Sequence, residues 1–323
     1  EDFPTQLSPM FGRPEVHEIF ADWRRILDDY SKDKGRERMM CGEVCVDPLE
    51  WQAEWTRPGE MQTVFNFSLL TTPFTAEAWK QTIVRSLQAY GTHGAPTTWV
   101  LSNHDVARHA TRLAYPDGYP KPGDGIGPND LQPVDAAHGV ERATAATSLL
   151  MALPGSIYLY QGEELGLPDH TTLSSEERED PTFHRTDGAR VGRDGCRIPL
   201  PWDNSQRGYG FSPTGQTWLS QPAEFSALAV NRQDSDPLSI LSRYRDMISL
   251  RKRHSLGAGQ LTLLSSPPEV LAFDNAGVRV IMNPSDRPVD ISPLIGSRSV
   301  EFESRSGSLA GNSLSPRSTV WIR

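Results

Sequence analysis

The sequence contains few cysteines and no long hydrophobic run. A membrane-spanning helix needs roughly 20 consecutive apolar residues, and no segment approaches that length. Only three cysteines occur among 323 residues. Cys41 and Cys45 fall in one expected strand, where a rise of about 3.3 Å per residue separates them by roughly 13 Å, too far for a disulfide. We therefore expect free thiols and a reducing, cytoplasmic location.

Basic residues are fewer than acidic residues. The 41 acidic residues outnumber the 32 Lys and Arg residues and give a net charge of −9. Such a surface repels phosphate backbones. The densest basic run, Arg251 to His254, ends an expected amphipathic helix, where cations favour the C-terminal end of the dipole. We therefore expect neither nucleic acid nor a membrane as a partner.

Sequence motifs for cofactors and metals are missing as well. Neither GxGxxG nor GxxxxGK[ST] occurs, which argues against a nucleotide-binding loop. The CxxxC spacing of Cys41 and Cys45 is not a strong zinc pattern, and no second Cys/His cluster supports it. A GxSxG segment is absent too, so a Ser/His/Asp triad has little support. We expect no cofactor and no metal.

What is present is an alternation of helical and extended patterns. Apolar spacing predicts helices over 14–30, 75–90, 136–153 and 237–254, and strands over 39–46, 61–70, 97–103 and 156–162. This alternation is typical of parallel β/α units. Residues 163–231 are polar and show no periodicity, and unstructured segments of that length are usually functional.

Composition changes near residue 256. The last segment has no Lys, and short apolar runs alternate with Pro, Gly, Asn and Asp. That pattern predicts a small antiparallel β-sandwich. We expect a catalytic domain over 1–255 and a separate β domain over 256–323.

Polar residues gather at the carboxyl ends of the predicted strands, where a (β/α)8 barrel has its active site. Glu43 lies in MMCGEVCVD, and we expect partial burial, which suits a general acid. An ordinary buried, paired Glu is the alternative. His104 and Asp105 end the apolar segment WVLSNHD. A plain turn is the alternative there, but the polar residues that follow favour a site.

Two further segments carry candidate residues. Arg197, in GRDGCRIPLPWD, is flanked by Cys196 and Ile198, so we expect it to be partly buried and aimed at a partner rather than in a surface ion pair. Glu163 and Glu164 in YQGEELG are either solvated or part of the site. Two carboxylates on separate strands suggest glycoside chemistry. Aromatic residues that could stack on sugar rings support this, namely Trp51, Phe65, Phe67, Tyr160 and Trp202.

These segments resemble the α-amylase family of glycoside hydrolases, and within it the bacterial, actinobacterial-like α-glucosidases and oligo-1,6-glucosidases. MMCGEVCVD is similar to the family's segment at the end of barrel strand five, and VLSNHD to that at strand seven. YQGEELG is similar to the start of the eighth β/α loop, and GRDGCRIPLPWD to the RDxxRxPMxWD stretch of the glucosidase branch. All four occur in the family's order.

The resemblance implies a role for each candidate residue. Glu43 would be the general acid/base, and Asp105 would bind hydroxyls of the non-reducing glucose and stabilise the oxocarbenium-like transition state. His104 would hydrogen-bond the same ring, and Arg197 would lie at the rim of that subsite. A Trp usual after the Glu-Val pair is replaced by Cys45. The family's metal-binding loop has no counterpart here, in line with the expectation of no metal.

The family's nucleophile also has no counterpart. It is an Asp in a GFRxD-like segment at the end of strand four, and neither that segment nor the strand-three Asn-His motif occurs. We therefore expect an α/β fold: the C-terminal half of a (β/α)8 TIM barrel, strands five to eight, followed by the β-sandwich. The nucleophile would precede Glu1, the missing N-terminal half of the barrel would be a partner, and this chain alone would not turn over substrate.

The complete protein is expected to be a retaining α-glucosidase that removes terminal α-linked glucose from maltose-like or isomaltose-like oligosaccharides. A trehalose synthase or a sucrose-converting transglycosidase is an alternative, because these enzymes share the same carboxylates. A noncatalytic transporter-associated relative is a second alternative. Such proteins usually carry a membrane helix and have lost carboxylates, whereas Glu43 and Asp105 are both present.

Overall fold

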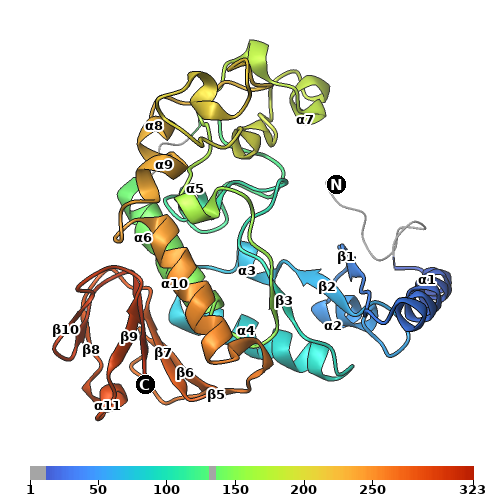
Figure 1. Cartoon of the computed structure of the whole chain (residues 1–323), viewed down its shortest axis with the longest axis vertical. Coiled ribbons are helices and arrows are strands. Elements are labelled where there is room, and N and C mark those ends of the chain that lie inside the picture. The colour runs from blue at the N-terminus through green and yellow to red at the C-terminus, as the bar shows by residue number, and fades with distance from the viewer. Residues whose placement is uncertain (1–11, 131–135) are drawn as a thin grey trace. The chain divides into compact units, whose positions relative to one another are not determined.

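The computed structural model describes residues 12–130 and 136–323, and the chain folds into two compact units (Figure 1). The first unit comprises the chain up to Leu69, Lys80–Val100 and Pro154–Tyr158. The second comprises Leu70–Trp79, Leu101–Leu153 and Leu159–Arg323. We describe each unit by itself.

A four-stranded parallel sheet forms the centre of the first unit. Its strands follow one another in chain order, β1 (Cys41–Gly42), β2 (Thr63–Asn66), β3 (Thr98–Trp99) and β4 (Ser156–Ile157). The predicted parallel β/α character is therefore confirmed, but every strand is shorter than predicted. The expected strand over 61–70 ends early because the Asn66 side chain accepts the backbone N–H of Ser68 over 3.0 Å, and a helical turn follows at once.

Helices α1 (Pro14–Lys34) and α2 (Leu49–Glu54) lie in the first unit, together with most of α4 (Ala76–Gly91). Proline at its first turn and a left-handed Gly35 at its end bound α1. The unit's core is apolar and consists of Val44, Leu49, Ala53, Trp55, Met61, Val64, Ala89 and Tyr90. Only one edge of α1 packs on this core. Trp23 and Ile26, on its predicted apolar face, are 52% and 65% exposed.

The second unit contains the two other long helices, α6 (Ala136–Leu150) and α10 (Ile240–Arg253). The aperiodic segment before α10 forms only short turns of helix. These are α7 (Pro181–Arg185), α8 (Phe225–Leu228), α9 (Val230–Gln233) and 3-10 turns at Glu163–Leu165, Ser175–Glu177, Asp194–Arg197 and Arg207–Gly210. Short helices α3 (Ser68–Thr71) and α5 (His109–Arg112) lie earlier in the chain. Apolar residues of the aperiodic segment form a small core centred on Leu165, Ile198 and Phe225.

All the strands beyond residue 260 are antiparallel. One sheet has the order β5 (Leu261–Leu263), β6 (Leu271–Asn275), β7 (Val278–Asn283), β12 (Ser318–Ile322), β9 (Val300–Glu303). The other has the order β10 (Leu309–Ala310), β11 (Ser313–Leu314), β8 (Val289–Asp290), and α11 (Ser292–Ile295) lies between β8 and β9 in the chain. The antiparallel character is as predicted, and the domain boundary at 256 stays a prediction.

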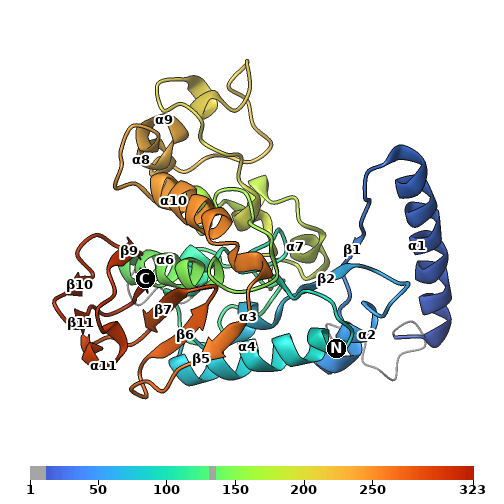
Figure 2. The same ribbon diagram turned by 60° about the horizontal axis from the view of Figure 1, so that its bottom comes forward.

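The antiparallel region packs on α6 (Figure 2). Thr319 donates from Oγ1 to the carbonyl oxygen of Ala145 over 2.8 Å, and the Trp321 indole donates to that of Ser148 over 3.0 Å. Both side chains are completely buried. Buried hydrogen bonds of this kind fix the register of β12 on the helix.

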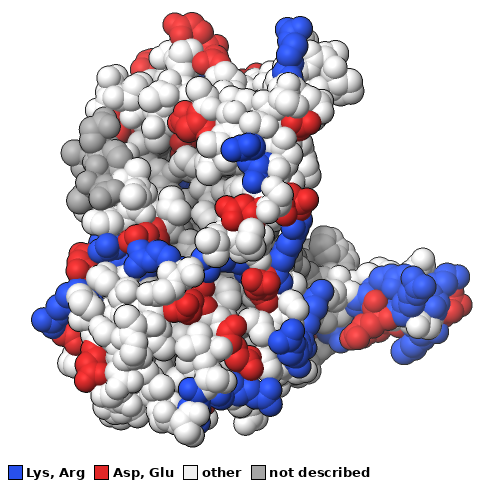
Figure 3. All heavy atoms as spheres, turned by 60° about the vertical axis from the view of Figure 1, so that its left-hand side comes forward, with Lys and Arg blue, Asp and Glu red and all other residues white. Residues whose placement is uncertain are grey.

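Charged side chains of both signs lie on the surface. On the face shown in Figure 3, acidic and basic side chains are interspersed. Within the described ranges, none of the helices combines the length and the apolar character needed to cross a lipid bilayer.

Candidate functional site

Asp105 lies in a tight turn of the second unit, a few residues beyond β3. Leu101 and Ser102 are buried, and the chain then turns at Asn103, whose side-chain oxygen accepts the backbone N–H of Asp105 over 2.8 Å. A turn was the alternative to a site at this segment. The structure shows the turn, and this turn presents the half-buried Asp105 carboxylate to other side chains.

Two arginines hold this carboxylate. Asp105 Oδ1 accepts from Arg193 Nη1 over 2.7 Å and from Arg197 Nη2 over 3.0 Å. Arg197 Nε also donates to the carbonyl oxygen of His104 over 2.8 Å, and the His104 imidazole lies 3.6 Å from Asp105 Oδ1. The structure therefore brings together three of the four predicted site residues, His104, Asp105 and Arg197.

A second carboxylate, Asp180, anchors the arginines from behind. Its Oδ2 accepts from Arg193 Nε over 2.6 Å and lies 3.8 Å from Arg197 Nη1. Asp180 is 1% exposed. Burial alone would raise its pKa, but hydrogen bonds from the Arg193 side chain and from the backbone N–H groups of Thr182 and Arg193 hold the pKa below the usual range. Two guanidinium groups and two carboxylates thus form a cluster of balanced charge.

Arg108 joins the segments that carry this cluster. It is 1% exposed and donates from Nη1 to the carbonyl of Gln161 over 2.6 Å and from Nη2 to that of Cys196 over 2.8 Å. Its backbone N–H donates to Asp169 over 2.9 Å. The guanidinium also lies 4.8 Å from the ring of Tyr160, whose hydroxyl donates to the same Cys196 carbonyl. The turn bearing Arg193 and Arg197 is held by these contacts.

Behind Arg108 lies a buried polar network. His109 bridges Ser102 and Thr147 through its two ring nitrogens, and Thr147 contacts the Tyr244 hydroxyl over 3.1 Å. Burial lowers the pKa of His109 to about 3, so this imidazole is neutral at physiological pH. Burial also raises the pKa of Glu163 to about 8. Of the two candidate glutamates, Glu163 is therefore buried and largely protonated, whereas Glu164 is half-buried.

Glu43 lies in the first unit, directly after β1. Its neighbours Gly42 and Val44 are buried, whereas Glu43 and Cys45 are exposed. The expected partial burial is wrong, because the Glu43 side chain is exposed. β1 is the first strand of the sheet and has β2 as its only neighbour within the described residues, so little protein covers its open face.

Metal and thiol chemistry have little structural support here. Over residues 12–130 and 136–323, no group of three or more His, Cys, Asp or Glu side chains is arranged to hold a metal ion. The three cysteines are free thiols. Cys196 is buried, and burial raises the pKa of its thiol, which makes it unreactive.

Comparisons with known proteins identify the class. Residues 5–259 match the α-amylase catalytic domain, and the chain belongs to this family. It is 30% identical over 283 residues to a probable α-glucosidase of Rhizobium meliloti, a match that covers 85% of this chain and 46% of that protein. An oligo-1,6-glucosidase of Saccharomyces cerevisiae is 25% identical over 313 residues, with 85% and 49% covered.

Solved structures give the same result. The crystal structure of an α-glucosyl transfer enzyme superposes with a TM-score of 0.76 at 29% identity, over 96% of this chain and 54% of that chain. The chain thus spans about half the length of the relatives it matches. The predicted family and the α/β fold with a parallel sheet are confirmed.

Sequence reasoning missed part of the cluster. Arg193 stands in GRDGCRIPLPWD and Arg108 three residues after VLSNHD, but neither had an assigned role, and Asp180 had no signal as a site residue. The Asp180-Pro181 pair does mark the start of α7, since the Asp180 side chain accepts the backbone N–H of Thr182. That local signal gives no hint of the ion pair with Arg193.

Proposed function

We propose that this chain is part of a retaining α-glucosidase that hydrolyses terminal α-linked glucose from maltose-like or isomaltose-like oligosaccharides. The observation that carries the proposal is the Asp105 carboxylate held by Arg193 and Arg197. A carboxylate with fixed orientation can accept hydrogen bonds from neighbouring hydroxyls of one sugar ring. The arginines beside it donate to ring or hydroxyl oxygens.

In this proposal the two predicted carboxylates act at different moments. Glu43 protonates the departing glycosidic oxygen and then removes a proton from the attacking water. Asp105 binds the glucose in the ground state and stabilises positive charge on the ring as the oxocarbenium-like transition state forms. His104 and Arg197 complete the glucose subsite.

We further propose that β1 to β4 are strands five to eight of a (β/α)8 barrel and that the β region is a sandwich domain. Sequential order of four parallel strands supports this arrangement, because strand order runs around a barrel without reversal whereas a doubly wound sheet reverses. The uncovered apolar face of α1 supports a partner segment that supplies the remaining strands and the nucleophile. The chain's span, about half of its relatives, agrees with this.

The test compares the purified chain with the same chain joined to the sequence that its gene encodes upstream. We expect no glucose release from maltose or p-nitrophenyl α-glucoside by the chain alone, and release by the joined protein. Glu43→Gln in the joined protein should remove most activity on maltose. Glu37→Gln, a nearby exposed glutamate, should leave it intact. Turnover by the chain alone would contradict the need for a supplied nucleophile.

One observation favours a second candidate, a transglycosidase. The α-glucosyl transfer enzyme matches 96% of this chain at 29% identity. Transfer and hydrolysis share the same carboxylates and differ in whether a sugar or a water accepts the glucosyl group. Product analysis of the joined protein on maltose, isomaltose and sucrose separates them, because hydrolysis yields monosaccharides alone, whereas transfer also yields new glucosyl saccharides alongside the released sugar.

A further inference from the structure

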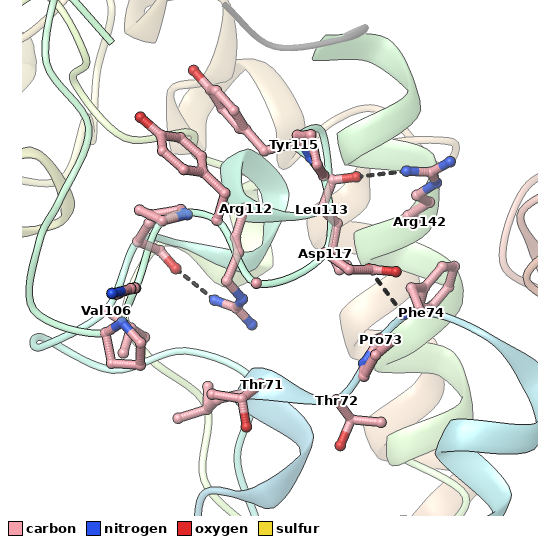
Figure 4. A pocket seen from close by; sticks show the side chains of 18 residues that line it. Thr71, Thr72, Pro73, Phe74, Val106, Arg112, Leu113, Tyr115, Asp117 and Arg142 are labelled. Carbon is pink, nitrogen blue, oxygen red and sulfur yellow. Dashed lines mark hydrogen bonds between the residues drawn. The ribbon is translucent and has the colours of Figure 1, made fainter. Parts of the chain in front are cut away.

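A pocket of about 120 Å³ lies wholly within the second unit, apart from the cluster around Asp105 (Figure 4). Its volume is about ten times the roughly 10–15 Å³ that one water molecule requires. Much of its wall is rigid and apolar, formed by four prolines and by Phe74, Tyr115 and Tyr119. A small molecule with an apolar or ring-shaped body fits such walls.

The polar lining of this pocket is mainly cationic. Arg112, Lys121 and Arg142 line it, against the single carboxylate Asp117. Asp117 is already engaged, since it accepts the backbone N–H of Phe74 over 3.4 Å. Arg142 stabilises the wall of the pocket by donating to the carbonyl oxygen of Leu113 over 3.0 Å. Arg112 and Lys121 are therefore the cations open to a ligand.

The Arg112 side chain extends into the pocket (Figure 4). It projects from α5 between Val106, Asp117 and the Thr71–Thr72 segment (Figure 4). It donates to the carbonyl oxygens of Ala107 over 2.6 Å and Leu101 over 2.9 Å, and none of its bonds within the described part of the chain goes to a carboxylate. A guanidinium group has five N–H donors, so donors remain for a ligand.

The charge of Arg112 persists in this environment. Burial lowers the pKa of Arg112 to about 10, while Asp169 and Glu163 oppose the shift through space. The guanidinium therefore stays protonated at physiological pH. A half-buried cation whose hydrogen bonds in the described chain go to carbonyl oxygens gains free energy when an anion approaches, because the attraction is less screened there than in bulk water.

From these contacts we propose that the Arg112 pocket binds a small oxyanion, a phosphate or carboxylate group, whose carrier contacts the aromatic and proline wall. Arg112 takes the oxyanion through its planar fork, and Lys121 adds a second, flexible cation. This site is distinct from the Asp105 cluster. The proposal does not depend on the proposed hydrolase function, since no turnover is involved.

The test is isothermal titration calorimetry of the purified chain with inorganic phosphate at constant ionic strength. We expect saturable binding with a dissociation constant of about 1 mM or tighter. Lys121→Gln, at an exposed position, should weaken it roughly three- to tenfold, and Arg112→Gln should abolish it. Lys252→Gln, which removes an exposed charge from α10 of the same unit, is the matched control and should have no effect.

Two further ligands identify the source of the oxyanion. Tighter binding of glucose 6-phosphate than of phosphate would indicate a phosphorylated sugar, and equal binding a free anion. Binding of acetate would indicate a carboxylate, whereas glucose should not compete. Because Arg112→Gln could disturb folding, its far-UV circular dichroism spectrum is compared with that of the parent protein. If the spectrum of Arg112→Gln is altered, the binding measured for Lys121→Gln decides between the outcomes. Absence of saturable binding up to about 20 mM phosphate, or equal losses in Lys121→Gln and Lys252→Gln, would overturn the proposal.

Discussion

Arg193 donates to Asp180 through Nε over 2.6 Å while its Nη1 donates to Asp105 over 2.7 Å. One guanidinium therefore couples a buried carboxylate, Asp180, to the half-buried carboxylate proposed to bind sugar. Its planar fork allows this, because two edges of the same group serve two acceptors. The orientation of Asp105 thus depends on a residue that does not itself contact it.

Asp180→Asn tests this coupling through stability. The native pKa of Asp180 lies below its unfolded value of about 3.9, so the ionised form stabilises the fold above that pH, and this contribution is lost as pH falls further. We expect the variant to be less stable by about 1–3 kcal/mol at pH 7, with the difference shrinking below about pH 4. Urea unfolding at pH 3, 5 and 7 measures it. Asp234→Asn, in an exposed pair with Arg245, serves as the control, and equal losses in both variants would contradict the account.

Glu163→Gln should change the pH dependence of stability in the opposite sense. The native pKa is about 8 because of burial, above an unfolded value of about 4.3. The native state therefore holds the proton that the unfolded state has lost, and stability falls as pH rises between these values, by up to about 1.4 kcal/mol per unit. The variant should lack this decline, so the melting temperature of the variant should rise relative to that of the parent between pH 5 and pH 8. Glu164→Gln should follow the parent, and a parallel decline in Glu163→Gln would refute the assignment.

Arg108→Met should loosen the turn that carries Arg193 and Arg197. It leaves the carbonyl groups of Gln161 and Cys196, the second of them buried, without a charged donor, which should cost several kcal/mol at about 1–3 kcal/mol for each lost bond. Faster amide hydrogen exchange over residues 193–198 is the specific readout. Arg245→Met, on the surface of α10, should cost less than about 1 kcal/mol. Unchanged exchange in Arg108→Met would show that the turn is held by other contacts.

The uncovered face of α1 gives a prediction about the partner segment. Trp23→Ser should cost the chain alone about 1 kcal/mol, because Trp23 is 52% exposed and its ring meets that of Phe20 edge-on. Trp79→Ala, at a fully buried position, should cost about 3–5 kcal/mol. In the protein joined to its upstream sequence, Trp23→Ser should become strongly destabilising. Equal effects in the short and the joined protein would argue against a partner on this face.

Local patterns predicted much of the fold. Helices α1, α4, α6 and α10 lie where the apolar spacing indicated, since that spacing reflects which helix face is apolar. Strand lengths were overestimated because buried residues such as Val100 and Leu101 continue the apolar run beyond the paired segment of β3. Composition alone does not distinguish a buried extended segment from a hydrogen-bonded strand.

The site was predictable only in part. Asp105, His104 and Arg197 stand in recognisable segments, but the contact between Arg193 and Asp105 joins residues 88 positions apart and has no local signal. Asp180 looks like a helix cap in the sequence and becomes an anchor only through the fold. Likewise, nothing in YQGEELG indicated that Glu163 is buried rather than Glu164.

The proposed role of Glu43, as the general acid of an α-glucosidase, is tested most directly by kcat/KM in the protein joined to its upstream sequence. This parameter reports formation of the glycosyl intermediate. The sugar that leaves maltose must be protonated as it departs, whereas the p-nitrophenolate that leaves p-nitrophenyl α-glucoside need not be. Glu43→Gln should therefore lower kcat/KM for maltose by about 10²–10⁴-fold. The fall in kcat/KM for the aryl glucoside should be smaller than that for maltose by a factor of at least about ten. Glu37→Gln should leave both values unchanged. An equal fall for the two substrates, or no fall for maltose, would contradict the account.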